Sequence, residues 1–404
     1  MRRVVITGMG AVSACGLGAE ALISATQAGK SGAKPVQFED LPQQRVSTAA
    51  RLSKEDIAAI VGPKPHKMRD PVVEYALHAA REAVAQAGLG EEHFGEACGV
   101  SIGSGQGGAE TLNTNYLKFG REGPMRLDPM TVPKIMNNAA AGWVSIEFGA
   151  MGPAFCLATA CSAGSQSIGL GLQMVASGQV ERCLAGGAEA CLVSGGFRIW
   201  ELLRVMTATQ NRPFSKDRNG MMLGEGAGVL VVESLDAAQE RGAQILCELT
   251  GFGTNADAGD LLRPDPKRAA ACMRMALKHA GLSPDRIDYL NAHGTGTVAN
   301  DINEVVALRD VFGENLEGLE VSSTKPIHGH ALGAAGALEM IVAIGALLRQ
   351  SAPPTINFSE VDPKIGLKPV PNVAKPVSIS AVMSNSLAFG GINASLVAQR
   401  YDDC

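Results

Sequence analysis

Cys161 has the surroundings that best suit nucleophilic chemistry in this chain. It lies in FCLATACSAGSQSIGLGLQMVASG, where an apolar stretch ends at Ala160 and small residues follow the cysteine at once. The pattern predicts a strand up to Ala160 and a helix from about Ser162 to Ser177, so the sulfur would stand at the positive end of a helix dipole. Backbone N–H groups there favour a thiolate and can hold an oxyanion. A buried structural cysteine is the alternative, and it is the commoner fate of this residue type.

Two histidines are candidates for the partners that a nucleophilic cysteine needs. His293 lies in YLNAHGTGT, at the end of an apolar strand and inside a tight turn. His330 lies in SSTKPIHGHALGAAGALEMIVAIGALL, at the start of a long helix rich in Ala and Gly. Both follow predicted strand ends, as Cys161 does, and α/β folds place their sites there. His328 lies close to His330 in the same segment, and the sequence does not exclude it.

Lys325 and Glu339 flank His330, the lysine just before it and the glutamate on the helix that follows. A buried Lys–Glu pair would shape the electric field around that histidine. Two solvated charges are the alternative, although the apolar neighbours of Glu339 count against it.

Glycine-rich turns raise two further hypotheses. GSGQGG (Gly103–Gly108) matches G-x-G-x-x-G, and ITGMG opens like a dinucleotide fingerprint, but no acidic residue ends a following strand to hold a ribose. The sequence therefore does not predict NAD binding. Near the C-terminus, SNSLAFGGINASLV predicts a strand, a turn at Phe389-Gly390-Gly391 and a final strand. Phe389 is either a core residue or a mobile lid.

Composition narrows the class of protein. The chain has 404 residues, is 46% hydrophobic and 19% charged, and carries a formal net charge of -5. It can bury a large core, and its charge argues against whole-surface attraction to nucleic acid or anionic membrane. The 9 cysteines form no C-x-x-C pair and have no histidine at metal-ligand spacing, so we expect neither a disulfide framework nor a metal site. No apolar run approaches a membrane span and no signal peptide is evident, so we expect a cytoplasmic protein.

An internal repeat of two sequence segments indicates the architecture. VVITGMG near the N-terminus resembles CELTGFG at Cys247–Gly253, and the helical EYALHAAREAVAQAGL resembles AAACMRMALKHAGL, each closing on Ala-Gly-Leu. Two matches in the same order predict a duplication, with halves at 1–245 and 246–404 and an insertion at about 29–67 in the first. Strands alternating with helices predict an α/β fold with mostly parallel, buried sheets.

Together these motifs resemble the β-ketoacyl-acyl carrier protein (ACP) synthases, the type I/II condensing enzymes, and most closely β-ketoacyl-ACP synthase II. The matching stretches span essentially the whole chain: ITGMG, TACSAG, GGAEA, LGEGAG, NAHGTGT, SSTK with GHALGAAGALE, and NSLAFGG-N. The resemblance implies the thiolase-like fold, in which two duplicated halves form an α-β-α-β-α layered sandwich, usually homodimeric. That architecture agrees with the internal sequence repeat.

The resemblance also implies a reaction. Cys161 would hold an acyl group as a thioester, while His293 and His330 would bind the malonyl thioester oxygen and assist loss of CO2. The result is a decarboxylative Claisen condensation that lengthens a fatty-acid or polyketide-like chain by two carbons. Binding the enolate oxygen with two histidines is reasonable, because decarboxylation puts negative charge on that atom.

Further roles follow from the same resemblance. Lys325 would organise the site with Glu339, and the backbone N–H groups of Cys161 and Phe389 would form an oxyanion hole, with Phe389 as the gate. No metal or organic cofactor is implied, because substrates arrive on the phosphopantetheine of ACP. ACP is an acidic partner, and the candidates for a basic docking patch are Lys64, Lys67, Arg69 and Arg204.

Departures from the family pattern bear on the substrate. Leu387-Ala388 stands where housekeeping synthases usually have Phe-Gly, and Gln106 stands where an apolar residue commonly lines the acyl pocket. Pro-Ile-His before Gly329 replaces the frequent Ser-Met-Thr. These changes raise the hypothesis of a specialised relative of the nodulation, very-long-chain or polyene type, including a ketosynthase subunit of a heterodimer.

Other classes fit less well. A thiolase uses a second cysteine near the C-terminus, and the late one here is the final residue, Cys404. The initiating synthase type has Asn where His330 stands, and a non-catalytic chain-length partner lacks the nucleophile. A papain-like hydrolase would carry its cysteine near the mature N-terminus and would not explain the duplication.

Overall fold

The sheet of this protein repeats one strand order twice. In the computed structural model, which describes residues 2–402, the first half has the order β6-β5-β7-β8-β1 and the second β11-β10-β14-β15-β9. In each half the first three strands pair in parallel and the next pairs are antiparallel. Strands β1 and β9 then pair antiparallel where Val5 faces Glu248. This repeated order confirms the predicted duplication.

The elements of the first half are β1 (Val4–Ser13), α3 (Pro71–Ala87), β5 (Cys98–Gly103), β6 (Ala154–Phe155), α7 (Ala163–Ala176), β7 (Arg182–Glu189) and β8 (Gly226–Ser234). Those of the second are β9 (Cys247–Ala256), α10 (Pro266–Ala280), β10 (Tyr289–Asn291), α11 (Val298–Phe312), β11 (Glu320–Ser322), α13 (Ala335–Arg349), β14 (Ala381–Ala388) and β15 (Ile392–Gln399). Outside this repeat lie α1 (Ala19–Gln27), α2 (Lys54–Val61), α4 (Ala109–Glu122), α5 (Thr131–Ile135), α6 (Ala139–Phe148), α8 (Ser194–Leu202), α9 (Leu235–Glu240) and α12 (Lys325–His328). Short strands complete the chain: β2 (Gly16–Leu17), β3 (Lys34–Pro35), β4 (Thr48–Ala49), β12 (Ser351–Ala352) and β13 (Lys375–Pro376).

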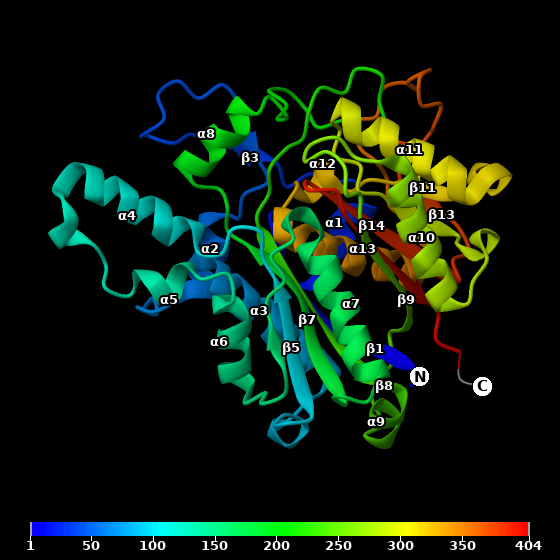
Figure 1. The fold of residues 1–404 in the computed structure, drawn as a ribbon, viewed down its shortest axis with the longest axis horizontal. Coiled ribbons are helices and arrows are strands. Elements are labelled where there is room, and N and C mark those ends of the chain that lie inside the picture. The colour runs from blue at the N-terminus through cyan, green and yellow to red at the C-terminus, as the bar shows by residue number, and fades with distance from the viewer. Residues whose placement is uncertain (1, 403–404) are drawn as a thin grey trace.

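The elements stack in layers, as Figure 1 shows. Helix α3 packs on β1 and β8 in the first half, and α10 packs on β9 and β15 in the second. Helices α7 and α13 lie between, because each contacts strands of both halves. This is the α-β-α-β-α arrangement expected from the sequence, and the boundary at 245/246 stays a prediction.

The two outer helices begin and end with the same local chemistry. The Asp70 side chain accepts a hydrogen bond from the Val72 N–H ahead of α3, and Asp265 accepts one from Lys267 ahead of α10. A proline follows each aspartate at the first helical position. A glycine with φ near 67° then ends each helix. An aspartate at the N-cap, a proline at the first helical position and a glycine in the left-handed conformation after the last turn are all preferred at helix ends.

The repeated Gly-x-Gly turns serve helix packing. A Cβ at Gly10 would lie 1.9 Å from the carbonyl oxygen of Ala79 on α3, and one at Gly253 would lie 2.2 Å from that of Cys272 on α10. Only glycine permits this approach. The glycines of ITGMG are therefore needed for helix packing, as are those of the matching turn in the second half.

Two expectations from the sequence are wrong. The strand predicted to reach Ala160 ends at Phe155, because the chain turns sharply to enter α7 and Ala160 has φ of 51°. An apolar run of membrane-spanning length does exist at Leu332–Arg349, although 89% of it is buried within the fold, as in a core helix. Cys404, on which the comparison with thiolases rests, lies outside the described residues.

Candidate active site

Cys161 lies in a tight turn directly before α7. The turn, Ala160–Ser162, is a short 3-10 helix, and α7 runs over Ala163–Ala176 as the sequence predicted. The cysteine side chain is buried, with 5% exposed. The thiol is thus held at the N-terminal end of a central helix, where it meets segments from the second half.

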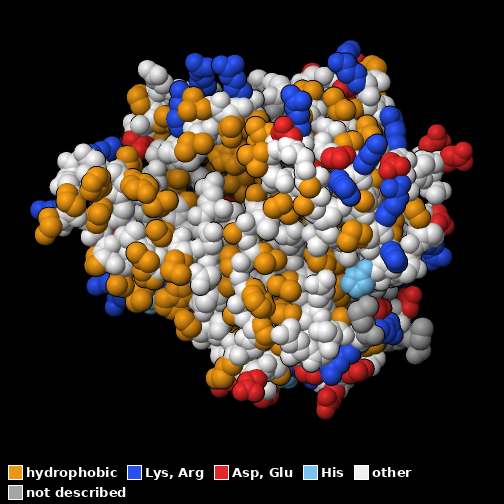
Figure 2. Space-filling model, viewed as in Figure 1, with side chains coloured by type: hydrophobic (Ala, Val, Ile, Leu, Met, Phe, Trp, Pro, Cys, Tyr) orange, Lys and Arg blue, Asp and Glu red, His pale blue; other side chains and the backbone are white. Residues whose placement is uncertain are grey.

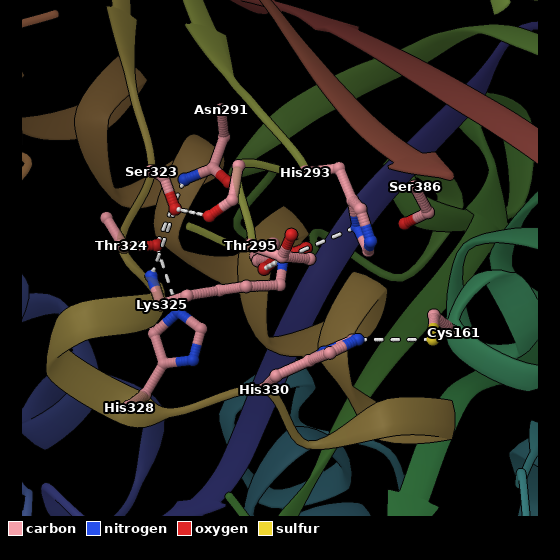
Figure 3. Close-up of polar contacts among 12 residues, drawn as sticks. Cys161, Asn291, His293, Thr295, Ser323, Thr324, Lys325, His328, His330 and Ser386 are labelled. Carbon is pink, nitrogen blue, oxygen red and sulfur yellow. Dashed lines mark hydrogen bonds and ion pairs between the residues drawn. The ribbon is translucent and has the colours of Figure 1, made fainter. Parts of the chain in front are cut away.

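His330 contacts the cysteine directly. Its Nε2 lies 3.1 Å from Sγ of Cys161. Backbone hydrogen bonds fix the histidine, since its N–H donates to the carbonyl of Met222 and its own carbonyl accepts from Gly224. Figure 3 shows the imidazole pointing at the sulfur from the segment before α13. The structure therefore brings together two residues that lie far apart in the chain.

His293 lies beside His330, with ring centroids 5.2 Å apart and ring planes at 84°. The Nδ1 atom of His293 lies 3.4 Å from Nζ of Lys325. An ammonium group can only donate, so Nδ1 accepts and the ring proton is on Nε2. His293 thus keeps an N–H donor free for a substrate oxygen.

Lys325 and Glu339 form a buried ion pair. Both side chains are almost fully shielded from solvent, and Nζ of Lys325 donates to Oε1 of Glu339. Burial raises the pKa of Glu339, and the neighbouring lysine opposes that shift. The predicted pair is present, and the alternative of two solvated charges is excluded.

His328 faces a different environment from His330. Its Nδ1 lies 2.8 Å from the carbonyl of Gly329, so this nitrogen carries the proton and Nε2 accepts from the Thr324 hydroxyl at 2.9 Å. Burial lowers the pKa of His328 to about 3. Both nitrogens are therefore satisfied within the fold, and the ring is a structural one.

Burial disfavours charge on the reactive groups of the site. Burial raises the pKa of the Cys161 thiol to about 12, although Lys325 and the Phe389 backbone oppose the shift. Burial, and then the charge of Lys325, lowers the pKa values of His293 and His330 well below their usual range. Burial thus opposes the thiolate that the helix N-terminus was expected to favour, and the charge state of Cys161 stays a prediction. Neutral imidazoles remain good N–H donors.

Two buried carboxylates in the site were not singled out from the sequence. Glu304 on α11 accepts the backbone N–H groups of His293 and Gly294, each at 2.7 Å. Glu189 at the end of β7 accepts those of Gly105 and Gly333 at 2.7 and 2.9 Å. Glu304 could have been found from the sequence, because acidic residues occur in the first turns of the helix that follows NAHGTGT. Carboxylates at such positions commonly accept backbone N–H groups of the preceding turn. Both fix the turns that carry the site.

A cavity of about 180 Å³ opens from Cys161 and the two histidines. Its other walls include Trp200, Leu203, Met221, Leu387, Phe389, Thr295, Thr297, Asn300 and Arg263. Gln106 does not line this cavity; its backbone N–H donates to Glu189. Leu387 thus lies where a substrate would bind, and the role of Gln106 in acyl selectivity stays a prediction.

The predicted docking residues differ in their surroundings. Lys64, Lys67 and Arg204 are exposed, and Arg204 sits between two cavity-lining residues. Arg69 is instead engaged by Glu74 and Glu147 and lies over the Trp143 ring at 4.3 Å, with 14% of its side chain exposed. Arg69 is therefore the least exposed of the four candidates, and its role in docking stays a prediction. Within residues 2–402, no cluster of three or more His, Cys, Asp or Glu side chains could hold a metal ion.

A cysteine paired with two neutral histidines, in a duplicated five-layer fold, defines a condensing enzyme of the thiolase-like class. The family models for the β-ketoacyl synthase N-terminal and C-terminal domains match residues 1–238 and 246–359. The chain belongs to the β-ketoacyl synthase family, and it is an acyltransferase.

Similar proteins agree with this assignment. A 3-oxoacyl-[acyl-carrier-protein] synthase 2 of Coxiella burnetii is 39% identical over 100% of this chain and 99% of its own length. Nodulation protein E of Rhizobium leguminosarum bv. trifolii is 41% identical over 98% of both. Among solved structures, the ishigamide ketosynthase/chain length factor matches with a TM-score of 0.94 and 36% identity over 99% of this chain and 100% of that one. A type II polyketide ketosynthase in complex with its acyl carrier protein matches with a TM-score of 0.92 and 29% sequence identity. That match covers 99% of this chain and 100% of the other.

Proposed function

We propose that Cys161 carries the acyl chain as a thioester and that His293 and His330 run the decarboxylative condensation with malonyl-ACP. The observation that carries this proposal is the 3.1 Å contact between His330 Nε2 and Cys161 Sγ at the base of a cavity. The division of labour also supports functional halves at 1–245 and 246–404, since the nucleophile comes from the first and both histidines from the second.

Acyl transfer is the first step. The Cys161 sulfur attacks the carbonyl of an acyl-ACP thioester, the carbon–sulfur bond to the carrier breaks, and the thiol proton leaves on the carrier thiol. His330 Nε2 is within reach of that proton. The backbone N–H groups of Cys161 and Phe389 hold the tetrahedral oxyanion.

Decarboxylation follows with malonyl-ACP in the same cavity. Loss of CO2 leaves an electron pair on the α-carbon and negative charge on the thioester oxygen. The Nε2–H of His293, set by Lys325, donates to that oxygen. His330 donates to it as well once Cys161 is acylated and the His330 ring proton is on Nε2, since no thiol proton then faces that nitrogen. The carbanion attacks the acyl-Cys161 carbonyl, the carbon–sulfur bond to Cys161 breaks, and a β-ketoacyl-ACP two carbons longer leaves. The released Cys161 sulfur takes up one proton from water, which restores the thiol.

The partner that delivers both substrates is an acyl carrier protein, whose phosphopantetheine supplies the reactive thiol without any further cofactor. Thr295, Thr297 and Asn300 give the cavity a polar side suited to an amide-containing arm. Arg204 beside the cavity, with Lys64 and Lys67, offers positive charge to an acidic carrier. The free cysteines among the described residues fit the reducing cytoplasm.

A second subunit covers the apolar face that α4, α5, α6 and β6 present. Tyr116, Met125, Ile146 and Met151 are exposed there, with Met125 at 93%, and β6 ends the sheet. Figure 2 shows hydrophobic side chains gathered over α4 and α5. An exposed apolar patch beside an edge strand is suited to pairing between chains. The occupant we favour is a second copy, which gives a homodimer.

A specialised ketosynthase subunit in a heterodimer is the second candidate. The nodulation relative and the ketosynthase/chain length factor match favour it, as does Leu387 in the cavity wall. Sedimentation equilibrium separates the two: a dimer of the purified chain supports the homodimer. A chain that stays monomeric until a related subunit is added supports the heterodimer.

Mass spectrometry after incubation with a panel of acyl-ACP thioesters tests the reaction. We expect one acyl mass per chain, on Cys161 alone, with the preferred chain length and unsaturation read from the panel. Cys161→Ala should lose both the adduct and condensation. An adduct on Cys156 or Cys183 would contradict the assignment.

A further inference from the structure

Trp200 and Phe389 stack on each other at the cavity that leads to Cys161. Their ring centroids are 5.9 Å apart and their planes differ by 17°. Both rings line the cavity, and Phe389 is 37% exposed. A hollow lined by hydrophobic side chains opens beside α8 on the face shown in Figure 2. The pair therefore stands between solvent and the nucleophile.

The tryptophan is carried on a firmly anchored helix. Phe197 lies one turn before it on α8, is fully buried, and packs against Phe38 with ring centroids 5.4 Å apart. Glu201, the next residue, accepts the backbone N–H groups of Arg45 and Val46 at 2.8 and 2.7 Å. These contacts tie α8 to the inserted segment, so the helix turn that carries Trp200 is anchored on both sides of it.

The phenylalanine is carried on a turn that can move. Phe389 follows the last residue of β14, and the next two residues are glycines with φ of 84° and 66°. Outside its own turn, the Gly390 N–H donates to the carbonyl of Leu261, which lies in an exposed loop, and the Gly391 carbonyl accepts the N–H of Asp257. Glycine pairs permit the backbone change that a hinge needs.

We propose that Trp200 is a positioning residue that holds the Phe389 gate closed over Cys161. The stack joins a ring on an anchored helix to one on a hinged turn, so it sets how often the turn opens and how easily an acyl group reaches the sulfur. The inference rests on the proposed role of Phe389 as a gate, and it adds the residue that controls that gate. Nothing in the sequence pairs positions 200 and 389, which lie in different halves.

The rate of Cys161 alkylation by iodoacetamide measures this gate without any acyl substrate. Peptide mass mapping follows Cys161, and the half-buried Cys15 in the same sample corrects for reagent activity. Loss of one aromatic pair should raise the open population, so Trp200→Ala should speed alkylation about threefold to tenfold. Trp200→Phe keeps a ring and should stay within about twofold of the unmodified protein.

Three further variants make the test specific. Leu203→Ala removes an apolar side chain from the same wall but leaves both rings, and it should have little effect. Phe389→Ala should itself speed alkylation, and adding Trp200→Ala to it should change nothing more, because the tryptophan acts through the phenylalanine.

The outcomes separate the inference from the proposed function. If Phe389→Ala speeds alkylation while Trp200→Ala does not, the gate stands and the role of Trp200 is overturned. Additive effects of the two substitutions, or an equal effect of Leu203→Ala, would also overturn it, since cavity size alone would explain them. If neither ring matters, both the gate and its control by Trp200 are wrong, whereas acylation of Cys161 is judged separately by mass.

Discussion

The Nζ atom of Lys325 lies 3.4 Å from Nδ1 of His293, and this contact decides which nitrogen of the imidazole carries the proton. Because Lys325 is also paired with the buried Glu339, its position is set from two sides. Lys325 therefore decides which nitrogen of His293 faces the substrate as a donor, although Lys325 itself need not touch the substrate.

Lys325→Met should lower malonyl-ACP decarboxylation about a hundredfold, because His293 loses the charge that fixes its tautomer. It should also lower the free energy of unfolding by about 3–5 kcal/mol, since Glu339 is left buried and unpaired. Lys325→Met/Glu339→Gln is the control, and it should recover much of the stability but not the rate. Recovery of the decarboxylation rate in the double variant would contradict this role.

His293→Ala and His330→Ala should each reduce decarboxylation severely, while Cys161 can still be acylated to some degree. His328→Ala should retain most of the rate, because its ring bonds to Thr324 and Gly329 and not to the cavity. It should instead lower the unfolding free energy by about 1–3 kcal/mol, because the buried O–H donor of Thr324 loses its acceptor. Radiolabelled CO2 release and urea unfolding measure the two effects. A His328 variant as inactive as the His330 variant would refute the assignment.

The alkylation rate of Cys161 should rise with pH without levelling off near neutrality. Burial raises the pKa of this thiol to about 12, so the thiolate fraction is small at pH 7 and grows about tenfold for each pH unit. Iodoacetamide rates between about pH 6.5 and 9 check this expectation. A plateau below about pH 8 would mean that the resting site holds a thiolate after all.

Gln106→Ile should improve the use of saturated medium-chain substrates relative to unsaturated or functionalised ones. An amide placed against an alkyl chain without a partner costs about 1–3 kcal/mol, which is about tenfold to hundredfold in selectivity. Specificity constants on matched saturated and polyunsaturated ACP thioesters measure the ratio. Leu387→Phe is the companion variant, because Leu387 lines the cavity and Gln106 does not. An unchanged ratio for Gln106→Ile would leave Leu387 as the selectivity residue.

Much of the framework could be predicted from local patterns. The helix after Cys161, the strand–glycine turn–strand around Phe389 and the repeated strand and helix pairs all follow from apolar spacing and from turn residues. Helix capping acts over neighbouring residues, which is why Asp70 and Asp265 mark the same boundary in both halves. The motif order then indicated which cysteine and histidines would meet.

The sequence by itself therefore determined the duplicated fold and the residues that we propose as reactive, because periodicity, caps and motifs are local properties of the chain. Only the tertiary structure decided the burial of Cys161, the engagement of Arg69 by Glu147, and the stacking of Trp200 on Phe389. Each of these depends on which distant segments exclude water from a side chain or supply its partner. Such properties arise when the two halves pack together, and no spacing along the chain encodes them directly.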